Sequence, residues 1–273
     1  MALNVSARSR KVFMRLSVII PNYNNEKYIA KCLDSVLEQT LRPDEILVVD
    51  DASTDSSVDI IRQYAEKHAN VIGIYLSENG GVSHARNTGI KAATGDCITT
   101  LDADDFYYNP EKLENEMRLL EQKGGNVLTY SKIVYCDETD EIIRYLDYPN
   151  RTYFQGNVLS ALLMERITKT LMRDCCYPRQ AALDAGLYDE TSCLFEDYDF
   201  LIRLAKRLPF YCTFAYGTAY RQKEGGLSAR PPEECRAAKN AVIEKNCAQL
   251  APWKRMYCST YRKLKNMAVR LLK

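Results

Sequence analysis

The sequence of 273 residues predicts an α/β fold in which a mostly parallel central sheet is flanked by helices. Short apolar runs of strand length alternate with amphipathic stretches of helical period through the first hundred residues. Repeated strand–helix–strand units give parallel strands joined by right-handed crossovers. The runs that we expect to form strands buried on both faces are Leu16–Ile20, Ile46–Val49, Val71–Leu76 and Cys97–Leu101.

Amphipathic helices are expected between these strands. The first follows Asn24 and Asn25, which are suited to cap it, and its apolar positions between residues 28 and 37 recur every three or four residues. The second helix is expected from about Ser56 to His68 and the third from about Val82 to Ala93. Each should pack its apolar side against the sheet.

The second half of the chain has a more mixed pattern. We expect a helix, a strand, two helices, a strand and a final helix, in that order. Their ranges are Glu111–Gln122, Val127–Tyr135, Arg179–Ala185, Glu196–Arg207, Phe210–Ala215 and Glu233–Leu250.

The composition excludes several classes of protein. Hydrophobic residues at 46% and charged residues at 27% are ordinary globular values, and a net charge of +1 provides no field that would gather nucleic acid. The ten cysteines contain no CxxC pair, which argues against a zinc module or a disulfide framework and fits a reducing compartment. With no secretory signal and no apolar run of about 18 residues, we expect a cytoplasmic protein.

Three carboxylates follow the fourth apolar run, in TTLDADDFY. Asp102, Asp104 and Asp105 lie within four positions, where like charges repel and burial of an unpaired charge is costly. A positive partner is therefore expected. Such a cluster can bind a divalent cation together with substrate phosphates, or it can be a solvated acidic loop before the next helix. A phosphatase of the haloacid dehalogenase type is disfavoured, because Phe106 stands where its motif has Thr or Val.

Polar residues also follow the first two strands. Ligands of parallel α/β sheets bind beyond the carboxyl ends of the strands, so Tyr23, Asp50, Asp51 and the acidic cluster should crowd one crevice. A carboxylate in VVDDASTDSS can accept the imide N–H of a uracil base, and Tyr23 offers an aromatic face for stacking. Alternatively, Ser53 or Asp55 caps the next helix.

Taken together, SVIIPNYN, VVDDASTD, GGVSHARNTGI and LDADD, in this order, resemble the family 2 glycosyltransferases. The resemblance covers roughly residues 15–230. It implies the GT-A fold, a nucleotide-sugar donor such as a UDP-sugar, and transfer of the sugar to an acceptor hydroxyl with inversion. The chain then divides into a basic N-terminal tail (1–14), a nucleotide-binding half (15–109), an acceptor half (110–230) and a basic C-terminal helical extension (231–273).

The same resemblance assigns roles around the donor. The segment from Pro21 to Tyr23 is expected to frame the base, and Asp51 to contact it. Arg86, from the ARN segment, is expected near the diphosphate.

In the DxD motif, Asp102 is expected at the ribose and Asp104 at a divalent cation, Mg²⁺ or Mn²⁺, with Asp105 sharing or orienting that role. The cation would then be the counter-charge of the cluster.

The segment LFEDYDFLIRLAKR resembles the ED motif that opens a helix in this family. Asp197 is the expected general base, because an inverting displacement needs a carboxylate to take the proton of the acceptor hydroxyl. Glu196 is expected to orient the acceptor or Asp197, and Asp199 to turn away from the site. The alternative is a merely structural acidic first turn that the helix dipole favours.

One segment departs from the family pattern. Many members carry a histidine metal ligand in a segment like YRxHxGSLS, whereas this chain reads YRQKEGGLS over residues 220–228, with Lys223 at the match. A charged lysine cannot ligate a metal but can bind phosphate, so either metal use is altered or the alignment is shifted. Gly225, Gly226 and Ser228 would form a loop closing over the donor. A catalytically silent nucleotide-sugar binder or assembly protein is the alternative function.

The C-terminal extension ends in a basic tail without acidic residues, interleaved with apolar ones from Trp253 to Leu272. Such a tail can lie on an anionic membrane surface, or it can pack on the domain with its charged face in solvent. A saccharide or lipid-linked acceptor in surface polysaccharide or glycolipid synthesis would explain contact with the inner face of the membrane. The sequence predicts no particular oligomeric state.

Overall fold

The computed structural model describes residues 14–166, 174–192, 194–223 and 231–271, without the side chains of residue 151 and residues 262–271. Residues 1–13 of the predicted N-terminal tail lie outside these ranges. So does the predicted closing loop with Gly225, Gly226 and Ser228.

The main sheet has five strands in the order β3-β2-β1-β4-β8. The first four are parallel, as predicted, and β8 is antiparallel to β4. Every residue of β1 and β2 is buried, because helices cover both faces of the sheet. The strands are β1 (Leu16–Asn22), β2 (Glu45–Asp50), β3 (Val71–Tyr75), β4 (Cys97–Thr100) and β8 (Tyr177–Pro178).

Alternate residues of the central strands face two separate apolar clusters. Val18 belongs with Leu33 of α1, whereas Ile19 belongs with Ile90 of α3. This alternation is the period of two that a strand imposes on its side chains. The helices of the first half are α1 (Ile29–Leu37), α2 (Ser57–Lys67), α3 (Val82–Ala92) and α4 (Lys112–Gln122).

A second sheet has the order β5-β9-β6-β7 and joins the first through paired backbone hydrogen bonds between Thr129 and Cys176. Its strands are β5 (Phe106–Tyr107), β6 (Leu128–Cys136), β7 (Ile142–Tyr145) and β9 (Phe210–Arg221). We predicted that β9 ends at Ala215, which is wrong. Phe214 adopts a left-handed φ of 61° and the register shifts there, yet pairing with β6 resumes and continues to Arg221.

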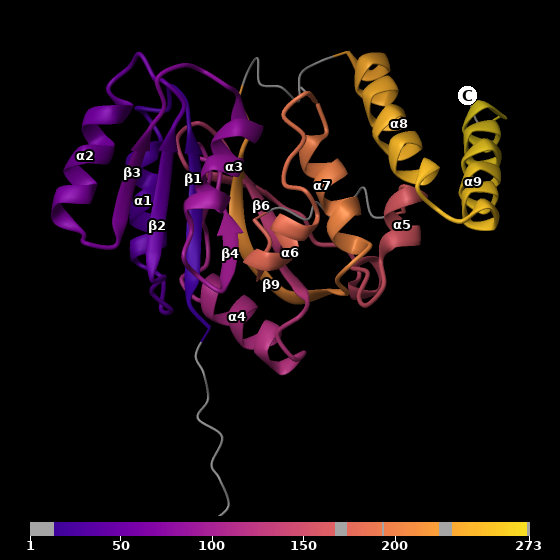
Figure 1. Ribbon diagram of the computed structural model, residues 1–273, viewed down its shortest axis with the longest axis horizontal. Helices are drawn as coiled ribbons and strands as arrows, with labels where there is room; N and C mark the ends of the chain where they lie inside the picture. The colour runs from indigo at the N-terminus through magenta and orange to yellow at the C-terminus, as the bar shows by residue number, and fades with distance from the viewer. Residues whose placement is uncertain (1–13, 167–173, 193, 224–230, 272–273) are drawn as a thin grey trace, which may run out of the picture.

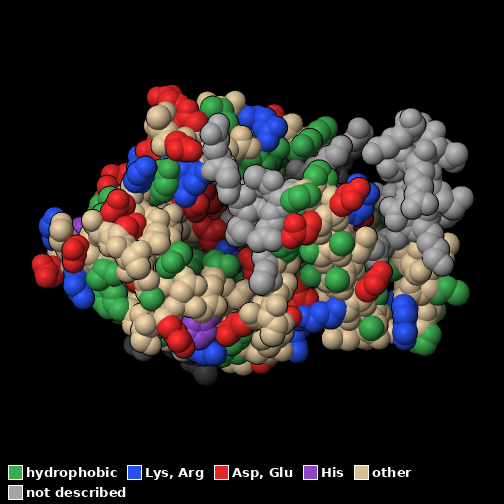
Figure 2. All heavy atoms as spheres, turned by 90° about the horizontal axis from the view of Figure 1, so that it is seen from above, with side chains coloured by type: hydrophobic (Ala, Val, Ile, Leu, Met, Phe, Trp, Pro, Cys, Tyr) green, Lys and Arg blue, Asp and Glu red, His purple; other side chains and the backbone are tan. Residues whose placement is uncertain are grey.

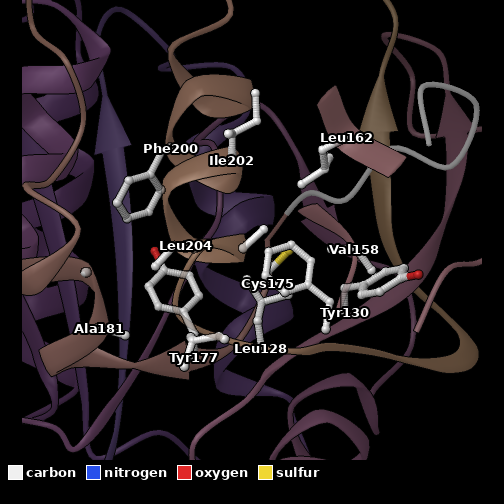
Figure 3. Packing of buried hydrophobic residues seen from close by; sticks show 14 of the residues in the cluster. Leu128, Tyr130, Val158, Leu162, Cys175, Tyr177, Ala181, Phe200, Ile202 and Leu204 are labelled. Carbon is white, nitrogen blue, oxygen red and sulfur yellow. The ribbon is translucent and has the colours of Figure 1, made fainter. Parts of the chain in front are cut away.

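The helices of the second half cover the junction of the two sheets. Figure 3 shows Phe200, Ile202 and Leu204 of α7 packed over Tyr177 and Leu128 from the strands beneath. In Figure 1, α8 and α9 lie side by side at the opposite end of the molecule from α2. These helices are α5 (Leu159–Leu163), α6 (Arg179–Asp184), α7 (Glu196–Ala205), α8 (Pro232–Ala248) and α9 (Pro252–Leu271), and a short 3₁₀ turn, η1, spans Asn150–Thr152.

Within the described ranges, none of the helices combines the length and the apolar character needed to cross a membrane.

Candidate functional site

The carboxyl ends of β1, β2 and β4 meet at one edge of the main sheet. Asn22 at the end of β1 is in register with Asp50 at the end of β2, and its amide nitrogen donates to Asp50 Oδ2 at 2.7 Å. The acidic motif that begins at Asp102 follows β4 directly. Figure 2 shows acidic side chains gathered in a hollow on the face that lies at the top of Figure 1. The predicted crevice is therefore present.

Asp51 holds the turn before α3. Its two carboxylate oxygens accept the backbone N–H groups of Gly80 and Gly81 at 2.9 and 2.8 Å, and the side chain is buried. Gly81 has a φ of 86°, a conformation that favours glycine. The structure thus gives Asp51 a structural role, and its predicted contact with a base stays a prediction.

The other residues expected around the base differ in exposure. Pro21 is buried near the end of β1, whereas Tyr23, directly after the strand, is 47% exposed. Tyr23 therefore offers the aromatic surface. The nearby Asp55 accepts the N–H of Ser57 at 2.9 Å, but the N-cap residue of α2 is Ser56 and has no side-chain cap hydrogen bond, so neither Ser53 nor Asp55 is the capping residue.

Arg86 joins the two acidic motifs. From α3, its Nη2 donates to Asp102 Oδ1 at 2.6 Å and its Nη1 donates to Glu196 Oε1 at 3.1 Å. The guanidinium is buried and lies 5.2 Å from the ring centre of Tyr188. Burial alone would lower the pKa of Arg86, but the two carboxylates outweigh it and raise the pKa, so the side chain stays charged.

The end of β9 brings further positive charge to the DxD loop. Lys223 Nζ lies 2.8 Å from Asp104 Oδ2 and 4.2 Å from the ring centre of Tyr28. The backbone N–H of Arg221 donates to Asp105 Oδ1 at 2.8 Å, and its Nε donates to the carbonyl of Asp104 at 2.7 Å. Arg86 and Lys223 thus pair with two of the three carboxylates, Asp102 and Asp104, which is the positive partner that the charge pattern required.

The same loop has suitable donors for a divalent cation. Oxygen atoms of Asp102, Asp104 and Asp105 lie within 4.8 Å of one another. Carboxylate oxygens are the ligands that Mg²⁺ and Mn²⁺ prefer, so the residues fit such an ion. Lys223 competes for one oxygen of Asp104, however, and would have to share or release it.

The ED motif opens α7 beside Arg86. Phe195, immediately before the helix, has a left-handed φ of 59°, and Glu196 and Asp197 form the first turn. Burial, and then the neighbouring Asp197 charge, raise the pKa of Glu196. Asp197 lines a narrow cavity together with Arg86, Tyr188 and other residues.

Asp199 turns away from the crevice, as expected. It is 1% exposed, and its oxygens accept hydrogen bonds from Arg203 Nε at 2.8 Å and from Asn246 Nδ2 at 2.7 Å. This residue therefore ties α7 to α8 and takes no part in the site.

Sequence analysis missed the role of Asn87. Its side chain exchanges hydrogen bonds with the backbone of Tyr188 at 2.8 and 2.9 Å and donates to Glu190 Oε1 at 2.6 Å. His84 lies 3.0 Å from the other oxygen of Glu190, so it has a structural partner. The sequence signal for this role was the ARN segment. Its Arg86 bonds to Glu196 of α7, and its Asn87 bonds to the segment before that helix.

The chain matches known proteins over most of this region. The model of the family described as "Glycosyl transferase family 2" matches residues 17–184, which is more than half of the chain. An uncharacterized glycosyltransferase of Haemophilus influenzae is 34% identical over 164 residues, covering 58% of this chain and 65% of the relative. The poly(ribitol-phosphate) beta-glucosyltransferase of Bacillus spizizenii is 47% identical over 141 residues, covering 47% of this chain and 22% of the relative. The chain thus spans less than two thirds of either relative.

Solved structures have the same fold. Residues 1–349 of S. aureus TarS, in complex with UDP-GlcNAc, superpose with a TM-score of 0.70 at 23% identity, covering 91% of this chain and 70% of that chain. GalNAc-T7 with UDP, GalNAc and Mn²⁺ gives a TM-score of 0.65 at 18% identity, over 86% of this chain and 48% of that one. These likenesses confirm the predicted GT-A fold. The family model, which matches more than half of the chain, identifies this protein as a member of glycosyl transferase family 2.

Proposed function

We propose that this protein transfers a sugar from a nucleotide-diphosphate sugar, a UDP-sugar, to an acceptor hydroxyl with inversion at the anomeric carbon. The observation that carries the proposal is the pair of bonds from Arg86 to Asp102 and to Glu196, which links the donor motif to the motif expected to supply the base. The TarS structure with UDP-GlcNAc supports a uridine donor.

The donor would lie across the carboxyl ends of the strands. Tyr23 provides an exposed aromatic face for the base, and Asp51 lies buried behind the same edge. Asp102 would meet the ribose. The charged groups of Arg86 and Lys223 pair with the two acids of the DxD motif, Asp102 and Asp104, which suits them to bind the two phosphates.

A divalent cation would be held by Asp104 and Asp105. When bound, it supplies positive charge to the departing diphosphate, which lowers the barrier to breaking the sugar–phosphate bond. Lys223 gives the diphosphate a further cation of the protein's own.

The chemistry would be one in-line displacement. The acceptor oxygen forms a bond to the anomeric carbon while the bond to the diphosphate oxygen breaks, and the acceptor proton passes to the carboxylate of Asp197. Glu196, held by Arg86, would orient the acceptor or Asp197.

The acceptor is proposed from the relatives. The Bacillus relative is named for poly(ribitol-phosphate), so a hydroxyl of a surface polysaccharide or glycolipid is the acceptor class that we favour. A lipid-linked acceptor would bring the reaction to the cytoplasmic face of the membrane.

A nucleotide-sugar binder without catalysis is the second candidate. The contact of Lys223 with Asp104 favours this candidate, because an ammonium group paired with the expected metal ligand weakens the binding of a metal ion to that carboxylate. The carboxylate of Asp197 beside Arg86 favours the enzyme.

Donor titration and turnover separate the two. UDP binding should be measured by calorimetry with and without Mn²⁺, followed by hydrolysis and transfer with a panel of UDP-sugars. Asp197→Asn should keep UDP binding within about twofold and lose at least about 100-fold in transfer. Asp104→Ala should lose both metal response and turnover, whereas the control Asp59→Asn on the exposed surface of α2 should change neither. UDP binding without hydrolysis or transfer of any sugar would support the silent binder.

A further inference from the structure

Helix α9 presents apolar side chains to solvent. Trp253, Met256 and Tyr257 are 64%, 68% and 60% exposed, and their spacing of three and four residues puts them on one side of the helix. The adjoining side contacts the protein, where Cys258 is 3% exposed and Tyr261, one turn after Tyr257, packs against the core cluster that includes residues of α8. Trp253, Met256 and Tyr257 are therefore left outside the contact that holds α9 to the domain.

The sequence of the helix beyond Tyr261 includes the apolar residues Leu264, Met267 and Leu271. The helix contains six basic residues and no acidic one. They are Lys254, Arg255, Arg262, Lys263, Lys265 and Arg270.

The charge of α9 argues against a second copy of this chain as the partner of its exposed apolar side. Two copies packed through this surface would bring together two helices that carry six basic residues each, with no acidic residue of α9 to offset them. A surface that is apolar inside and negative outside matches the helix on both counts. A membrane leaflet with anionic lipids is such a surface.

We infer that α9 lies along an anionic membrane surface, with the side that carries Trp253, Met256 and Tyr257 in the boundary between headgroups and acyl chains. The exposed Lys254, which flanks this side, meets the lipid phosphates, and the positive charge of the other basic residues of α9, such as the exposed Arg255, adds to the attraction. Helix α9 lies at one end of the molecule, and the acidic hollow opens on an adjacent face (Figures 1 and 2). This inference does not depend on the proposed reaction.

The single tryptophan of the chain, Trp253, makes the test specific. Full-length protein is mixed with vesicles of equal parts phosphatidylglycerol and phosphatidylcholine, and tryptophan emission and co-sedimentation are recorded. The emission should shift to the blue and the protein should sediment with the vesicles, with both effects falling as salt rises. Lys254→Ala with Arg255→Ala should weaken binding about thirtyfold, that is ~2 kcal/mol. Met256→Ser with Tyr257→Ser should weaken it about tenfold or more.

Matched controls lie far from α9. Ile72→Ser with Ile143→Ser removes two exposed apolar side chains elsewhere, and Arg62→Ala with Lys67→Ala removes two exposed charges from α2. Both should bind vesicles like the unaltered protein, and circular dichroism should show all variants folded. Three results would overturn the inference. They are absence of both shift and sedimentation, equal binding to pure phosphatidylcholine vesicles, and a lipid-free dimer in ultracentrifugation that already shields Trp253.

Discussion

Replacing Lys223 with methionine should change metal binding and donor binding in opposite directions. Its ammonium occupies Asp104 Oδ2 at 2.8 Å, in a partly exposed pair whose side chains are 24% and 35% accessible. Lys223→Met removes the charge but keeps an apolar stem beside the ring of Tyr28. The carboxylate is then released to a divalent cation, while the proposed diphosphate loses one positive contact.

The magnitude follows from the exposure of the pair. Fully exposed ion pairs contribute about 0.2–1 kcal/mol, and hydrogen bonds to charged groups contribute about 1.5–3 kcal/mol when desolvated. A partly buried contact of about 1–2 kcal/mol corresponds to about 5- to 30-fold in affinity. We therefore expect Mn²⁺ to bind Lys223→Met about 5- to 30-fold more tightly without donor, and UDP to bind it more weakly by a similar factor in the presence of EDTA.

Both affinities can be measured without turnover. Free Mn²⁺ is followed by its paramagnetic resonance signal during titration of the protein, and UDP binding is followed by calorimetry. Lys223→His should also bind Mn²⁺ more tightly, because a neutral imidazole is a metal ligand. Lys31→Met is the control, since Lys31 of α1 lies over the ring of Phe106 in β5. Unchanged or weaker Mn²⁺ binding by Lys223→Met would refute the competition between lysine and metal.

Two further predictions concern stability. Lys112 and Glu116 form an ion pair of 3.0 Å, with side chains 1% and 0% exposed. Lys112→Met should therefore lower the free energy of unfolding in urea by about 3–5 kcal/mol, and adding Glu116→Leu should recover most of that loss. A double variant no more stable than the single one would contradict this prediction. Hydrogen bonds from Asn87 and from His84 lower the pKa of Glu190 below 4.5, so its contribution is present at neutral pH and is lost as the pH falls through the lowered pKa. Glu190→Gln should therefore cost up to about 1 kcal/mol at pH 7 and less at pH 3.5, and thermal melts showing an equal loss at both would count against it.

The regular part of the fold was predictable because its signals are local. Strands β1 to β4 and helices α1 to α3 follow apolar runs and helical periods that are read within ten or so residues. Strands β5 and β8 have two residues each, too few to show a period, and they exist because Phe106 pairs with Ala219 and Ile98 with Tyr177. Such pairings join residues far apart in sequence, so no local sequence pattern predicts them.

The site was predictable in part for the same reason. The rule that ligands gather at strand ends brought Asp51 and the DxD loop to one edge. That rule alone does not bring Lys223 to Asp104, 119 residues away, because the contact requires β9 to continue beyond an irregular turn at Phe214. Only the resemblance, which matched Lys223 to a histidine metal ligand, placed it near this loop. The prediction of a counter-charge was right in kind, but sequence reasoning assigned it to an ion alone.

The hydrogen bond between Asn246 of α8 and Asp199 of α7 limits where this chain can be joined to a relative in a chimeric protein. The family match ends at residue 184, so α7 and α8 both lie in the remainder, and a chimera that joins the two parents between these helices would separate the bonded partners. A graft that takes α7 without α8 leaves a buried carboxylate short of a donor one turn from the ED motif. Chimeras that take both α7 and α8 from the same parent should fold, whereas those that mix the two helices should be less stable.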